Sequence, residues 1–93
     1  MTYEWDPQKA AANRSKHRLE FDEASSVFLD PLALTFSDPA HSMEERREIT
    51  IGITMKGRLV FVSHCYRIGG IRIISARLCT RAEKKQYEEG IGN

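Results

Sequence analysis

The stretch REITIGITMKGRLVFVSHCYRIGGIRIISARL, residues 47–78, decides the fold. Isoleucines and a methionine alternate with polar or small residues over positions 49–55, which predicts a strand with one buried face. A Lys56-Gly57 turn leads into a segment that is apolar on both faces, as a central strand is. Gly69-Gly70 then turns the chain into a third strand, IRIISARL, residues 71–78. Short turns between consecutive strands predict an antiparallel sheet.

Two helices are expected before this sheet. Asp6 is a good N-cap and Pro7 suits the first helical position, so a helix should follow a short extended start and run to about His17. The segment FDEASSVFLDP, residues 21–31, predicts a second helix that Asp22 caps and that ends at its own Asp-Pro pair.

The remaining elements complete the expected fold. LALTF, residues 32–36, reads as a further strand, and the polar loop SDPAHSMEE follows it. Thr80 and Glu83 form a capping box that starts a last helix over residues 80–89. We therefore expect a single α+β domain over residues 1–93, ordered α-α-β-β-β-β-α: a four-stranded antiparallel sheet with two N-terminal helices and a C-terminal helix.

Composition agrees with an ordinary globular domain and limits the partners. The chain is 41% apolar, enough for a core, and its net charge is only +1, so nucleic-acid binding would require a local basic patch. No long apolar stretch or signal segment is visible, so we expect no membrane contact and a cytoplasmic location. Cys65 and Cys79 have no zinc-type spacing and are expected to be free thiols.

Two arginines lie where the third strand passes into the last helix. Arg81 would be the first helical residue, and Arg77 would lie near the end of the strand. A helix N-terminus binds anions and disfavours a cation by about 0.3–1 kcal/mol, so this placement is reasonable if a phosphate is held there. The alternative is an exposed Arg81 beside an Arg77 that is paired with Glu83.

Lysines repeat this pattern on the first helix. Lys9 lies in its first turn, and Lys9, Asn13 and Lys16 form one stripe at spacings of four and three. An RNA-binding stripe and a plain solvated helix face are both open interpretations.

The register of the last hairpin decides which polar side chains meet. A two-residue turn at Gly69-Gly70 would place four residues on one sheet face: His64, Tyr66, Ser75 and Arg77. Arg67 would then lie on the other face unless a longer loop or a bulge intervenes. His64 is either a general base or a core histidine. Tyr66 and Tyr87 are aromatic groups that can stack on unpaired bases, and both are further candidates for proton transfer.

Known cofactor and metal motifs are missing from the sequence. His64 and Cys65 point to opposite faces of their strand, and no P-loop, dinucleotide fingerprint or nucleophile elbow occurs. We expect no cofactor and no metal. An arginine can bind a phosphate through two parallel hydrogen bonds. Metal-free phosphodiester cleavage is therefore the enzymatic activity that these candidate residues allow.

Several motifs in the right order resemble the BrnT-type toxins of bacterial type II toxin–antitoxin systems. They are WDPQKAAANRSKH, DPLALTFSDPAHSMEERREITIG and IRIISARLCTRAEKKQYEE, which together span nearly the whole chain. The resemblance implies a RelE-like fold and an endoribonuclease that inhibits translation. It also implies a cognate antitoxin with a ribbon-helix-helix domain, through which alone the toxin would reach operator DNA.

The resemblance also suggests roles for single residues. The family's functional basic positions fall on Lys9, Arg67, Arg77 and Arg81, which would hold the scissile phosphate during attack by a ribose 2′-OH. Further RNA contacts are expected from Asn13, Lys16, Lys84 and Lys85. The main alternative is a non-catalytic toxin-fold subunit that binds the antitoxin and acts as a co-repressor. A free-standing DNA-binding protein is less favoured, because no helix-turn-helix pattern occurs.

Overall fold

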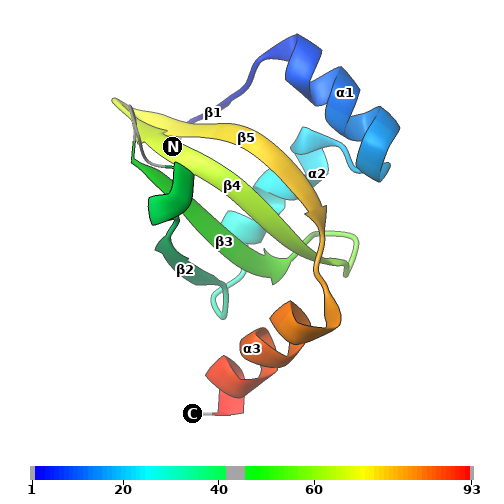
Figure 1. The fold of residues 1–93 in the computed structure, drawn as a ribbon, viewed down its shortest axis with the longest axis vertical. Helices are drawn as coiled ribbons and strands as arrows, with labels where there is room; N and C mark the ends of the chain where they lie inside the picture. The colour runs from blue at the N-terminus through cyan, green and yellow to red at the C-terminus, as the bar shows by residue number, and fades with distance from the viewer. Residues whose placement is uncertain (1, 42–45, 93) are drawn as a thin grey trace.

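A computed structural model describes residues 2–41 and 46–92. Its sheet has five strands in the order β1-β5-β4-β3-β2 (Figure 1). The strands are β1 (Thr2–Glu4), β2 (Leu34–Ser37), β3 (Arg47–Ile53), β4 (Leu59–Arg67) and β5 (Gly70–Leu78). The α-helices are α1 (Pro7–His17), α2 (Phe21–Ser25) and α3 (Arg81–Gly92), and the 3-10 turns are η1 (Ser26–Leu29) and η2 (Pro39–His41). The predicted loop over 37–45 falls partly outside the described residues.

The α+β class is confirmed, but the sheet is not the predicted four-stranded antiparallel one. The extended start forms a fifth strand, β1, which pairs in parallel with the first residues of β5. Gly70 permits this approach, because a Cβ atom there would lie 2.3 Å from the carbonyl oxygen of Thr2. The hydroxyl of Thr2 also donates to the carbonyl of Gly69 at 3.0 Å. The sheet is therefore mixed.

The first and last helices begin where their caps predict. A carboxylate oxygen of Asp6 accepts from the amide of Gln8 at 2.8 Å. At α3, Glu83 accepts from the backbone amide of Thr80 at 2.8 Å, and the Thr80 hydroxyl accepts from the amide of Glu83 at 3.3 Å. The prediction that Asp22 caps the second helix is wrong. The capping position is Glu20, so the helix starts at Phe21, two residues earlier than a cap at Asp22 would give, and it passes into a 3-10 turn after Ser25.

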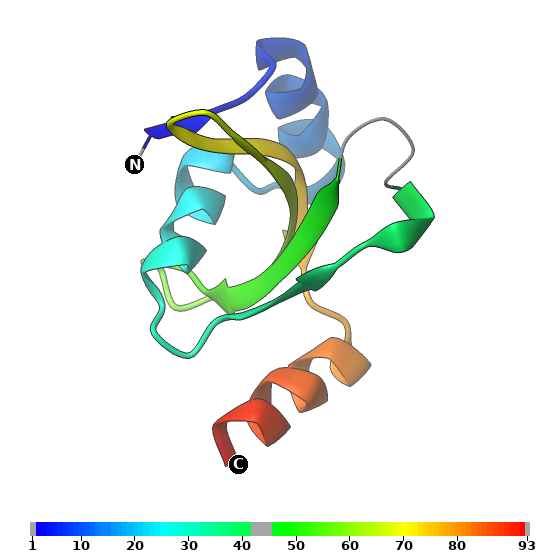
Figure 2. The same cartoon turned by 90° about the vertical axis from the view of Figure 1, so that its left-hand side faces the viewer.

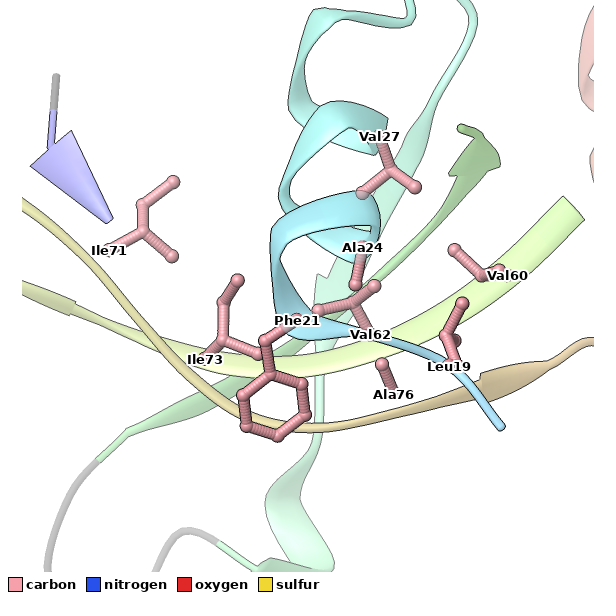
Figure 3. Close-up of a cluster of buried hydrophobic side chains, with 9 residues drawn as sticks. All are labelled: Leu19, Phe21, Ala24, Val27, Val60, Val62, Ile71, Ile73 and Ala76. Atoms are coloured by element: carbon pink, nitrogen blue, oxygen red, sulfur yellow. The ribbon is translucent and has the colours of Figure 1, made fainter. Parts of the chain in front are cut away.

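The helices cover the two faces of the sheet unequally. α1, α2 and η1 lie against one face, called here the inner face, and α3 lies at the opposite end of the molecule from α1 (Figures 1 and 2). Figure 3 shows the main core, in which α2 meets β4 and β5. Its members are Leu19, Phe21, Ala24, Val27, Val60, Val62, Ile71, Ile73 and Ala76. A smaller cluster on the other face, the outer face, joins Tyr87 of α3 to Ile49 and Ile51.

Strand β3 is buried differently from its predicted alternation. Ile49 and Ile51 are buried, but Ile53 is 42% exposed, and the polar Thr50 is only 1% exposed. The reason is that η1 covers the inner face of β3, where Gly52 leaves room for Val27. Thr50 satisfies its hydroxyl inside this layer with Thr35 at 2.8 Å. Both faces of β3 are therefore covered.

Within residues 2–41 and 46–92, Cys65 and Cys79 are not joined by a disulfide. No helix in these segments is both long enough and apolar enough to cross a membrane.

Candidate functional site

A β-bulge in β5 decides which side chains meet on the outer face. Ser63 lies opposite Ser75, whereas its neighbour His64 lies opposite Ile73, so Ile74 is an extra residue in the ladder. Side chains alternate along a strand, and an extra residue reverses the alternation beyond it. Residues after the bulge therefore point to the face opposite to the one that an uninterrupted strand would give them.

The predicted grouping of His64 and Tyr66 with Ser75 and Arg77 is consequently wrong. The hairpin turn is at Ile68-Gly69, one residue earlier than predicted. That shift alone would have kept the four side chains together, and the bulge separates them. His64 and Tyr66 lie on the inner face, while Ser75 and Arg77 lie on the outer face. The bulge also puts Arg67 on the same face as Arg77.

A pocket of about 360 Å³, called here the arginine pocket, lies on the outer face. Its lining comes from the three strands β3, β4 and β5 and from the residue after β2: Asp38, Arg47, Ile49, Phe61, Ser63, Ser75 and Arg77. Sequence reasoning did not select Arg47 or Asp38. Arg47 is in phase with the buried Ile49 and Ile51, and this alternation is the signal that places it on the outer face.

Arg77 is held firmly at this pocket. Its Nη1 and Nη2 donate to the two carboxylate oxygens of Glu83 at 2.7 and 2.9 Å. Its guanidinium lies 4.0 Å from the centre of the Phe61 ring, within cation–π range. The hydrogen bonds from Arg77 lower the pKa of Glu83, and the same bonds raise the pKa of Arg77. Arg77 thus has the acidic partner that the sequence offered as the alternative.

A second pocket of about 210 Å³, called here the lysine pocket, lies between α1 and β5. Lys9, Ala12, Asn13, Lys16, His17, Ile74 and Ser75 line it. Ser75 lines both pockets, so they adjoin across β5. The bulged Ile74 forms part of the wall between α1 and the strand. The predicted lysine stripe therefore lies next to Ser75, with both lysines exposed.

Asn13 belongs to this stripe but is occupied with the fold. Its amide nitrogen donates to the carbonyl of Leu19, and its amide oxygen accepts from the backbone amide of Ala76, both at 3.1 Å. The side chain is buried and joins α1 to β5 and to the start of the core. Asn13 thereby fixes the floor of the lysine pocket.

The other predicted basic residues lie elsewhere. Arg81, Lys84 and Lys85 line a separate open pocket on α3. Arg67 is six positions along β4 from Phe61, the residue opposite Arg77, which corresponds to about 20 Å. Arg67 and Arg77 therefore share a face but cannot bind the same phosphate, contrary to the expected arrangement.

His64 is a core histidine in this structure. It is fully buried, its Nε2 lies 2.8 Å from the hydroxyl of Thr50, and its ring packs edge-on against Phe28. Burial lowers the pKa of His64 to about 4. Nδ1 has no hydrogen-bond partner among the described residues. A side chain so enclosed on the inner face does not reach the arginine pocket.

Neither of the two candidate tyrosines lines the arginine pocket. The hydroxyl of Tyr87 donates to Asp30 at 2.7 Å, and burial together with this bond raises the pKa of Tyr87 to about 12. Tyr66 is 52% exposed and packs edge-on against His64 at the inner face. Within residues 2–41 and 46–92, no group of three or more His, Cys, Asp or Glu side chains is arranged to hold a metal ion.

Comparisons with known proteins agree with this fold. The family described as "Ribonuclease toxin, BrnT, of type II toxin-antitoxin system" matches residues 5–83. The crystal structure of the Brucella abortus ribonuclease toxin BrnT is similar, with a TM-score of 0.66 and 22% sequence identity over 87% of this chain and 100% of that one. At this identity the similarity establishes the fold alone. No curated protein matches the chain significantly.

Proposed function

Because the chain belongs to the BrnT family of ribonuclease toxins of type II toxin–antitoxin systems, we propose that it is an endoribonuclease that inhibits translation in the cytoplasm. The observation that carries the proposal is a pair of adjoining pockets within the matched residues, one lined by Arg77 and the other by Lys9 and Lys16. The arginine pocket and the lysine pocket meet at Ser75. A single RNA strand that crosses β5 at this point would place successive phosphates near both.

The proposed reaction is attack by a ribose 2′-OH on the adjacent phosphorus. The bond to the 5′-oxygen of the next nucleotide breaks, and this oxygen takes a proton from water, which leaves a 2′,3′-cyclic phosphate and a 5′-OH. Arg77 stabilises the charge that develops on the phosphate oxygens. Lys9 and Lys16 bind a neighbouring phosphate, and Arg81, Lys84 and Lys85 extend the basic track along α3.

Asp38 is the carboxylate that we assign to proton transfer. It lines the same pocket as Arg77, whereas His64 and Tyr87 are enclosed elsewhere. A carboxylate can accept the proton of the 2′-OH if it lies within hydrogen-bond reach of the bound substrate. The chain thus has a base and a phosphate-binding arginine on one face of the sheet, and the mechanism requires no metal.

Arg77→Ala tests the function directly. Purified protein should degrade single-stranded RNA in the presence of EDTA, and the variant should lose at least about a hundredfold in rate, as removal of a group that stabilises transition-state charge does. Product ends identify the reaction, since 2′-OH attack leaves a cyclic phosphate. Undiminished cleavage by Arg77→Ala would exclude the arginine pocket as the active site.

Family membership implies an antitoxin, which we propose carries a ribbon-helix-helix domain and brings the toxin to operator DNA. The pairing of Arg77 with Glu83 favours one alternative: a toxin-fold subunit that serves only as antitoxin partner and co-repressor. Growth of cells in which the protein is expressed without the antitoxin distinguishes the two functions. Arrest that Arg77→Ala abolishes supports the nuclease, and normal growth with ample soluble protein supports the co-repressor.

A further inference from the structure

We propose that Glu83 is a positioning residue, which holds the guanidinium of Arg77 in the orientation that binds the scissile phosphate. The inference deepens the proposed function and rests on it. Glu83 was expected only as a helix cap or as the partner that would make Arg77 unavailable. In the structure Glu83 both caps α3 and pairs with Arg77. The N–H groups of Arg77 that Glu83 leaves unused are placed to bind a phosphate.

Contacts on three sides fix the plane of the Arg77 guanidinium. The carboxylate of Glu83 receives two hydrogen bonds at one edge. Nη1 also donates to the carbonyl of Leu78 at 3.3 Å. The ring of Phe61 covers one flat side, 4.0 Å from the guanidinium carbon. A flexible side chain is thereby ordered before any substrate arrives, which lowers the entropic cost of orientation on binding.

The hydrogen bonds leave a usable pair of donors. A guanidinium has five N–H groups, and the bonds to Glu83 and Leu78 occupy both of those on Nη1 and one on Nη2. The other two, on Nε and Nη2, lie on a second edge of the same plane. No hydrogen bond to the described residues uses them. Two parallel donors of this kind match two oxygens of a phosphate.

Glu83 is itself held in place by the start of α3. Its carboxylate accepts from the backbone amide of Thr80 at 2.8 Å, and its side chain is only 18% exposed. The hydrogen bonds from Arg77 and Thr80 lower its pKa, so it stays ionised at neutral pH. The capping box therefore fixes the Glu83 carboxylate relative to the start of α3, and this carboxylate in turn fixes the guanidinium of Arg77.

This arrangement has a kinetic consequence that a purely structural ion pair lacks. The ionised pair carries no net charge, so it attracts RNA weakly and acts through geometry. Replacing Glu83 by glutamine restores a net positive charge at the pocket. The glutamine has a single acceptor oxygen, and its amide N–H groups face the second donor of Arg77. RNA should bind more tightly while the guanidinium loses its orientation.

The test compares Glu83→Gln with Asp22→Asn in steady-state cleavage of a fluorescent RNA oligonucleotide in EDTA. Asp22 is exposed on α2 and lines neither the arginine pocket, the lysine pocket nor the pocket on α3, so its replacement controls for the loss of one negative charge. We expect Glu83→Gln to lower KM severalfold and to lower kcat by roughly ten- to a hundredfold, the cost of a small misplacement. Asp22→Asn should keep the wild-type kcat. An unchanged kcat for Glu83→Gln would overturn the inference.

Two further measurements separate positioning from folding and from failure of the proposed function. Arg77→Lys keeps the charge but not the paired donors, so its kcat should be as low as that of Arg77→Ala. If kcat of Glu83→Gln falls only in proportion to the folded fraction seen by circular dichroism, the role is structural. Cleavage that depends on Arg77 but not on Glu83 contradicts this inference and leaves the nuclease intact.

A readout without catalysis is the Nε–H resonance of Arg77 in a nitrogen-15 spectrum. In the wild type it should be narrow and should shift on addition of inorganic phosphate. In Glu83→Gln it should broaden through exchange with water. A wild-type resonance that does not respond to phosphate contradicts the inference, whether or not the protein cleaves RNA.

Discussion

At the scale of single residues, His64 makes the folding stability depend on pH. Burial lowers its pKa from 6.5 to about 4 in the folded state, whereas the unfolded chain retains the ordinary value. Between these values the unfolded state binds more protons than the folded state does. The free energy of unfolding is therefore highest above pH 6.5 and falls as the pH approaches 4. The loss should reach about 3 kcal/mol. Urea unfolding at pH 7 and at pH 4.5 measures it.

The variant His64→Gln should remove most of this dependence, because glutamine does not titrate. His17→Gln, which replaces a histidine on α1, should show the same change of unfolding free energy with pH as the wild type. If His64→Gln and the wild type lose stability equally between pH 6.5 and 4.5, another group is responsible. Buried carboxylates such as Glu23 have lowered pKa values and lose their contribution only at more acidic pH.

At the scale of elements, the parallel pairing of β1 depends on the missing side chain of Gly70. A Cβ atom at this position would meet the carbonyl oxygen of Thr2 at 2.3 Å and its hydroxyl at 2.7 Å. Gly70→Ala should therefore push β1 away from β5 and cost about 1–3 kcal/mol. Faster amide hydrogen exchange in residues 2–4, together with a lower denaturation midpoint, would report the change.

A matched control for this substitution is Gly57→Asn in the turn between β3 and β4. Gly57 has φ +77°, no atom would lie within 4 Å of its Cβ, and asparagine tolerates the left-handed conformation. Its cost should stay below about 0.5 kcal/mol. If the amides of residues 2–4 exchange as slowly in Gly70→Ala as in the wild type, the assignment of β1 to the sheet is contradicted.

At the scale of the whole molecule, the net charge of +1 means that RNA affinity must come from the grouping of cations and not from their number. Lys9 and Lys16 lie at one pocket, and each phosphate contact to a single strand contributes about 0.7 to the slope of log affinity against log salt. The double variant Lys9→Ala/Lys16→Ala should reduce this slope by about 1.4. Fluorescence anisotropy of a labelled RNA over a salt series measures it.

Lys56→Ala is the matched control, because Lys56 is an exposed lysine of the turn between β3 and β4, outside both pockets. It removes one charge and should leave the slope nearly unchanged. A slope that falls about half as much for Lys56→Ala, which removes one charge where the double variant removes two, would show that RNA responds to overall charge. A slope that the double variant leaves intact would remove the lysine pocket from the RNA path.

Much of the fold was predictable because its signals are local. The caps at Asp6 and at Thr80 with Glu83 lie within three residues of the amides that they bond, so they mark where α1 and α3 begin. Alternation within residues 49–55 likewise identified β3. The partners of a strand are not local: the extended residues 2–4 pair with β5 nearly seventy residues away, and no short-range pattern predicts that.

The candidate site divides in the same way. The sequence by itself determined which cations are available and that Lys9 and Lys16 share a helix face, because helix geometry sets that spacing. Only the tertiary structure decided that Ser75 and Arg77 leave the core. The bulge at Ile74 lets Ile73 and Ala76 both pack under α2, and this packing between distant segments turns Arg77 to the outer face, where it meets Phe61 and Glu83.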